Sequence, residues 1–191
     1  MLRTARSRTH RAAVAVTCVT LSAGAALAAP ASASAAPPNV LVSCTASGQV
    51  HFNPGVQLIP RPQHVSYEGQ DGPCNDNSGY SIRSGKLTAS FDGVSLSCLH
   101  SGSSGTGRGT GTIDWTDRYG NTGRSIVNAQ IDSSTLNTGH VSGTVSEGLF
   151  EGHSFSGTFN TSLAGGAFRC TIGAPAGGLK DAAFTGDYSI N

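Results

Sequence analysis

The chain has 191 residues, of which 26 are glycine and 12% are charged, and a formal net charge of +1 at pH 7. Its basic residues gather only at the N-terminus, so the rest of the chain lacks the positive surface that nucleic acids or anionic membranes require. The length suits one domain beside a short leader.

The first 35 residues predict export. Four arginines precede an apolar run over residues 12–29, and Ala33-Ser34-Ala35 offers the small residues that signal peptidase reads. The run is mostly alanine with Thr and Ser between, which is too polar for a retained membrane helix. We expect a Sec-type signal peptide over residues 1–35 that is cleaved near Ala35, and a secreted domain over residues 36–191 with no membrane span.

Loss of the signal peptide changes both the charge and the cysteine count. Eight basic and eleven acidic residues remain, a net charge of −3, and Cys18 is removed. The four cysteines left in an oxidising compartment predict two disulfides, for which three pairings are open. We favour Cys44 with Cys74, which closes a local loop, and therefore Cys98 with Cys170. The long, irregular spacings do not suit zinc, so we expect neither a metal nor a cofactor.

The secreted region alternates apolar and polar residues with a period of two, which predicts β-strands with one buried face. Gly, Ser and Thr recur too often for a long amphipathic helix. In chain order the predicted inward residues are Leu87, Ala89 and Phe91; Val94, Leu96 and Cys98; Ile113 and Trp115; Val141, Gly143 and Val145; Phe155, Gly157 and Phe159; Phe168, Cys170 and Ile172; and Phe184, Gly186, Tyr188 and Ile190.

Turn-forming residues separate these runs. They lie at Asn53 to Gly55, Asp71 to Pro73, Asp76 to Gly79, Asp92-Gly93, Gly120-Asn121, Asn137 to Gly139 and Gly173 to Pro175. Their spacing predicts an all-β domain of about nine or ten antiparallel strands, stapled by disulfides. Either a single β-barrel or a β-sandwich satisfies this pattern.

A short motif of a small residue, glycine, a small or acidic residue and an apolar residue recurs in these runs. It begins at Thr110, Ser142, Ser156 and Thr185. A glycine two residues before an inward apolar side chain leaves room for a bulky neighbour from the next strand. The repeat therefore supports the β prediction and says nothing about function.

Candidate catalytic residues are few. Glu147 and Glu151 bracket a predicted hairpin and could approach each other across it, as the acid and base of a glycosidase do. Ser154 stands in a broken nucleophile-elbow motif whose sequence continues as a strand, so we do not expect it to be a nucleophile. The histidines of the secreted region show no i, i+2 or i, i+4 pairs of the kind that bind metals.

Two aromatic residues are candidates for a flat ligand platform. Trp115 and Tyr119 lie close together in the sequence and could present their rings to a sugar or an apolar ligand. However, Trp115 shares the parity of Ile113, which favours a place in the core.

The sequence also resembles a group of small secreted proteins. The strings from Cys44 to Gly48, Phe52 to Gly55, Ser97 to Cys98, Gly111 to Trp115 and Gly148 to Gly152 are similar to those of small exported, β-rich proteins of actinomycetes such as Streptomyces. The resemblance implies a shared β fold and export. It implies no activity and no site residues.

These observations favour a non-enzymatic, monomeric extracellular domain that binds a small apolar ligand, a glycan or another protein. Two alternatives stay open. One is a secreted hydrolase that uses Glu147 and Glu151, and the other is an inert envelope or structural protein. Nucleic acid is not an expected partner.

Overall fold

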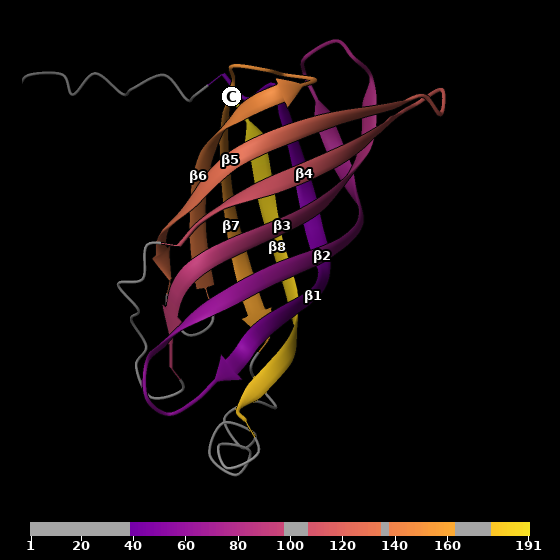
Figure 1. Cartoon of the computed structure of the whole chain (residues 1–191). Coiled ribbons are helices and arrows are strands. Elements are labelled where there is room, and N and C mark those ends of the chain that lie inside the picture. The colour runs from indigo at the N-terminus through magenta and orange to yellow at the C-terminus, as the bar shows by residue number, and fades with distance from the viewer. Residues whose placement is uncertain (1–38, 98–106, 135–137, 163–176) are drawn as a thin grey trace, which may run out of the picture. The chain divides into compact units, whose positions relative to one another are not determined.

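The computed structural model describes residues 39–97, 107–134, 138–162 and 177–191, which form a closed antiparallel β-barrel of eight strands (Figure 1). Each strand pairs with the next in chain order, and the last pairs with the first, so the sheet has no open edge. The strands are β1 (Val42–Val56), β2 (Arg61–Asp76), β3 (Ile82–Leu96), β4 (Arg108–Asp117), β5 (Thr122–Ser134), β6 (Thr138–Gly148), β7 (Ser154–Ser162) and β8 (Leu179–Ile190).

The predicted all-β class is confirmed. Of the two architectures left open, barrel and sandwich, the structure is the barrel, and it has eight strands and not nine or ten. Several turn-forming sequences lie inside long strands. Asp92-Gly93 falls within β3, at a bulge where the register of β2 with β3 shifts, and Gly93 has a φ of +74°. Asp71 to Pro73 likewise lies within β2, next to another register shift. A bulge uses the same Gly and Asp residues as a turn, so the sequence overstated the number of strands.

The interior is filled by side chains. Tyr67 lies against Phe184 with 5.1 Å between ring centroids, and Trp115 lies against Phe150 with 5.6 Å. A small apolar void of about 10 Å³ remains among Tyr67, Phe159 and their neighbours. That volume holds about one water molecule. An eight-stranded barrel is only just wide enough for its own side chains, and this one contains them.

Glycines let the strands approach closely where the wall bends. Gly48 of β1 lies directly opposite Gly69 of β2. A Cβ on Gly69 would lie 2.1 Å from the carbonyl oxygen of Leu87, so only glycine fits there. Gly157 and Gly186, both members of the repeated motif, leave space that the ring of Phe159 occupies.

The predicted disulfide between Cys44 and Cys74 is present. It joins directly opposed positions of β1 and β2, whose Cα atoms are 4.1 Å apart. Cys98 and Cys170, the strand expected around Phe168 and the predicted signal peptide all lie outside the described residues.

No helix long and apolar enough to cross a membrane occurs in the described ranges.

Candidate functional site

The two residues of the predicted aromatic platform, Trp115 and Tyr119, differ in burial: one lies in the core and the other at the surface. Trp115 is 1% exposed in the core, and its indole Nε1 donates a hydrogen bond of 2.8 Å to Ser125 Oγ. Ser125 Oγ in turn donates to the carbonyl oxygen of Leu149. Tyr119 is 83% exposed in the turn after β4. The two rings therefore share no accessible surface.

The predicted acidic pair lies where the sequence placed it. Glu147 is near the end of β6, Glu151 is in the turn that follows, and both side chains are exposed. Neither is buried in a cleft of the kind that tunes a catalytic acid.

Ser154 begins β7, and its hydroxyl donates to the backbone carbonyl of Asn191 at 3.3 Å. The strand continues to Ser162, so the strained turn of a nucleophile elbow does not form at Ser154. Among the residues that the structure describes, no three His, Cys, Asp or Glu side chains come together as a metal site.

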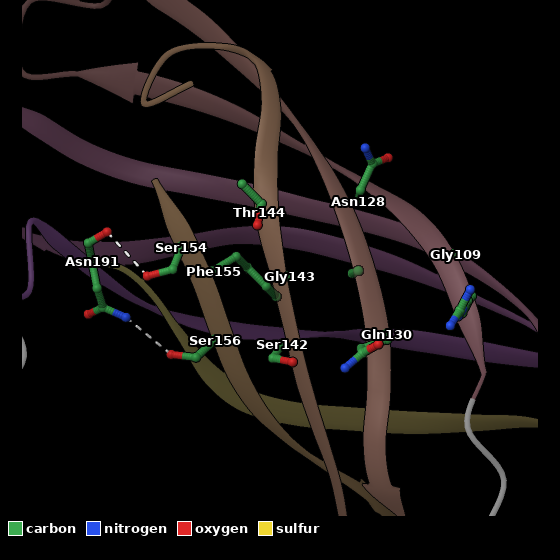
Figure 2. A pocket seen from close by; sticks show the side chains of 12 residues that line it. Gly109, Asn128, Gln130, Ser142, Gly143, Thr144, Ser154, Phe155, Ser156 and Asn191 are labelled. Carbon is green, nitrogen blue, oxygen red and sulfur yellow. Dashed lines mark hydrogen bonds between the residues drawn. The ribbon is translucent and has the colours of Figure 1, made fainter. Parts of the chain in front are cut away.

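A polar groove of about 860 Å³ crosses the outer wall of the barrel over β4, β5, β6 and β7 (Figure 2). Most of its lining consists of amide and hydroxyl side chains, with a single guanidinium at one end. The residues that line it are Arg108, Gly109, Asn128, Ala129, Gln130, Ser142, Gly143, Thr144, Ser154, Phe155, Ser156 and Asn191.

The strand register arranges these side chains in two rows across the sheet, as Figure 2 shows. In the first row Arg108, Gln130, Ser142 and Ser156 lie directly opposite one another on successive strands. In the second row Asn128, Thr144 and Ser154 do the same. Neighbouring strands are about 4.8 Å apart, so each row presents one polar side chain at about that interval.

Hydrogen bonds hold the first row in place. The side-chain amide of Gln130 and the hydroxyl of Ser142 both donate to Asp132 Oδ1, each at 2.9 Å. The amide of Asn191 donates to Ser156 Oγ at 3.4 Å. Asn191 Oδ1 is buried and has no hydrogen-bond partner among the described atoms. The first row therefore consists of oriented polar groups, and Asn191 beside it keeps an unused acceptor.

A smaller hollow of about 440 Å³ adjoins the groove and shares Ser142 and Ser156 with it. It extends over β8 and β1, because Ser156 lies opposite Ser189 and Ser189 lies opposite Ser43. The hydroxyls of Ser156 and Ser189 are 3.0 Å apart. The polar surface is thus continuous from β4 to β1.

Sequence reasoning did not predict the polar groove. Its polar side chains on β4 to β7 stand at outward positions, and outward positions are polar in any barrel with a buried interior. Only the register shows that Gln130, Ser142 and Ser156 share a row.

The fold and the groove together define an eight-stranded up-and-down β-barrel with a filled interior and a hollowed, polar outer wall. No family model, curated protein or solved structure matches the chain.

Proposed function

We propose that this protein is a secreted glycan-binding domain whose polar groove holds an extracellular polysaccharide. The groove carries eight polar side chains, of which seven are uncharged amides or hydroxyls. Groups of this kind both donate and accept hydrogen bonds, as the hydroxyls of a sugar do. This match of chemistry over a broad, shallow groove is the observation that carries the proposal.

The spacing of the rows supports a chain-like ligand. Strands about 4.8 Å apart present polar groups at intervals comparable to the length of one sugar residue in an extended polysaccharide. A glycan that lies across β4 to β7 along a row would therefore meet about one polar side chain of that row for each sugar residue. The adjoining hollow over β8 and β1 would continue the track.

The filled interior supports a site on the outer wall. Pockets for small molecules usually measure about 300–1,000 Å³, whereas the void in this barrel is about 10 Å³. An apolar ligand inside the barrel would have to displace the ring cluster around Tyr67. The outer groove needs no such rearrangement.

An open, polar groove predicts weak binding. Each hydrogen bond to the ligand replaces one to water and contributes only about 0.5–1.5 kcal/mol. Affinity should therefore rise with the number of sugar residues that the groove contacts, and single sugars should bind poorly.

Affinity electrophoresis against a panel of soluble polysaccharides tests the proposal. We expect at least one polysaccharide to retard the protein, and Asn128→Ala or Gln130→Ala to weaken that retardation about fivefold, which corresponds to one lost hydrogen bond of about 1 kcal/mol. Gln49→Ala is the matched control, because Gln49 is an exposed glutamine on β1 outside the groove lining.

Two results would count against glycan binding. The first is a panel in which no polysaccharide retards the protein. The second is retardation that Asn128→Ala and Gln130→Ala leave at the level of Gln49→Ala.

A further inference from the structure

Outside the groove lining, a serine, a histidine and an aspartate are connected by hydrogen bonds on the outer wall of β2 and β3. Ser90 Oγ lies 3.3 Å from His64 Nε2, and His64 Nδ1 lies 2.7 Å from Asp92 Oδ1. A hydroxyl on one ring nitrogen and a carboxylate on the other is the order of contacts in a nucleophile, base and orienting acid.

The pairing of β2 with β3, and a bulge in β3, bring the three residues together. Ser90 and Asp92 are two residues apart on β3 and therefore share its outward face. His64 of β2 lies opposite the bulge at Asp92-Gly93, between the pairs that Val65 and Gln63 make with β3. One imidazole can therefore reach both side chains of β3.

We infer that Ser90, His64 and Asp92 form a nucleophilic triad that hydrolyses carboxylic esters. Asp92 accepts a hydrogen bond from the protonated Nδ1 of His64, which leaves Nε2 free to accept the proton of the Ser90 hydroxyl. Ser90 Oγ then bonds to the acyl carbon of the ester as its proton passes to Nε2.

The remaining steps return the triad to its starting state. The ester C–O bond breaks, and the departing alcohol takes the proton from Nε2 and leaves an acyl group on Ser90. Nε2 next accepts a proton from water, whose oxygen attacks the acyl carbon. The carboxylic acid leaves, and Ser90 recovers its proton. The overall reaction consumes one ester and one water and produces one alcohol and one acid.

A second exposed histidine shows what distinguishes this cluster. His51 Nδ1 contacts Asp181, and His51 Nε2 lies 3.8 Å from Glu68 Oε2. Both nitrogens of His51 thus face carboxylates, which suits an ion pair. His64 faces a carboxylate on one side and a hydroxyl on the other, as acyl transfer requires.

The register connects the triad with the polar groove. Ser90 lies opposite Thr110, and Thr110 lies opposite Asn128, so Ser90 is in line with the second row, beyond the groove lining. Two strand spacings, about 10 Å, separate Ser90 from Asn128. Arg108 lies opposite Asp92 and also lines the groove, so it marks the place where the groove lining comes nearest to the triad along the strand register.

This placement indicates the substrate class, an acyl ester carried by a glycan that the groove holds. The substrate class rests on the proposed function, whereas acylation of Ser90 does not. The site is open to water, because the side chains of His64 and Asp92 are 47% and 82% exposed. Water weakens electrostatic stabilisation, so we expect slow turnover that is best detected by covalent labelling.

The test treats the full secreted protein with a fluorophosphonate, which phosphonylates activated serines, and locates the label by peptide mass. We expect the label on Ser90, none there in Ser90→Ala, and a labelling rate about 100-fold lower in His64→Ala, as loss of a general base predicts. His51→Ala is the matched control and should be labelled at the wild-type rate. Trp115 fluorescence checks that each variant is folded.

Absence of label on Ser90, or equal labelling rates in His64→Ala and the wild type, would overturn the triad. A second measurement, acetate release from an acetylated polysaccharide and from p-nitrophenyl acetate, tests the substrate class. We expect Gln130→Ala to slow release from the polysaccharide relative to Gln49→Ala. Hydrolysis of p-nitrophenyl acetate should fall in His64→Ala and stay at the wild-type rate in His51→Ala and Gln49→Ala. Labelled Ser90 with no polysaccharide binding would uphold the triad and contradict the proposed function. Polysaccharide binding with no label on Ser90 would uphold the proposed function and contradict the triad.

Discussion

Tyr188 places a phenol hydroxyl in the apolar interior. The residue is 2% exposed, and its hydroxyl has no hydrogen-bond partner among the described atoms. Burial, with a smaller contribution from the charge of Asp71, raises the pKa of this hydroxyl above its ordinary value. A buried polar group without a partner costs about 1–3 kcal/mol of stability.

We therefore expect Tyr188→Phe to raise the free energy of unfolding by about 1 kcal/mol at pH 7, measured by denaturant unfolding. The advantage should grow above about pH 10, because the tyrosine of the unfolded wild type ionises there while the folded one stays protonated, so the wild type loses stability. Tyr119→Phe, at an 83% exposed position, is the control and should change little. A less stable Tyr188→Phe would mean that the hydroxyl is satisfied in solution.

Parity along a strand was a reliable guide to single residues. It favoured a core position for Trp115, which the structure confirms, because a side chain that shares the face of Ile113 must point into the barrel. Parity cannot show which outward side chains have a function. Nothing in the sequence around His64 and His51 distinguishes the two histidines. They differ in the side chains that contact their ring nitrogens in the structure.

Among the strands, β2 and β3 show how glycine permits a tightly bent wall. Gly69 is buried where β2 meets β3, with the carbonyl oxygen of Leu87 against it. Gly139 on β6 has nothing within 4 Å of the place where a Cβ would lie, and its φ is not positive.

We expect Gly69→Ala to lower the free energy of unfolding by about 3 kcal/mol, because the new Cβ would collide with backbone that cannot move without breaking the sheet. Gly139→Ala should change it by less than about 0.5 kcal/mol. Thermal and denaturant unfolding of the two variants measure the difference. Equal stabilities would show that the wall at Gly69 relaxes freely.

The strand boundaries were the part of the fold that the sequence predicted least well. Asp92-Gly93 carries a strong turn signal, yet β3 continues through it as a bulge. A turn and a bulge need the same backbone freedom, so the residues at Asp92-Gly93 do not show whether the chain reverses there or continues along its partner strand. The turn at Gly120-Asn121 was predicted correctly, because apolar alternation resumes there on a new strand.

Across the whole barrel, the class of fold followed from the sequence, and the candidate sites did not. Ser90 lies 26 residues from His64, and Gln130 also lies 26 residues from Ser156. These residues meet, or share a row, only through strand register, which register shifts between β2 and β3, between β3 and β4 and between β5 and β6 help to set. A pattern along one strand contains no information about register across several.

The most direct measurement is a titration of the ¹⁵N-labelled protein with an oligosaccharide from the best-binding polysaccharide, followed by amide chemical shifts. The proposed function predicts that shifts concentrate on Asn128, Gln130, Ser142 and Ser156, while the buried indole of Trp115 stays unchanged. Shifts that cluster around the indole of Trp115, or on the wall around Gln49, would contradict binding in the polar groove.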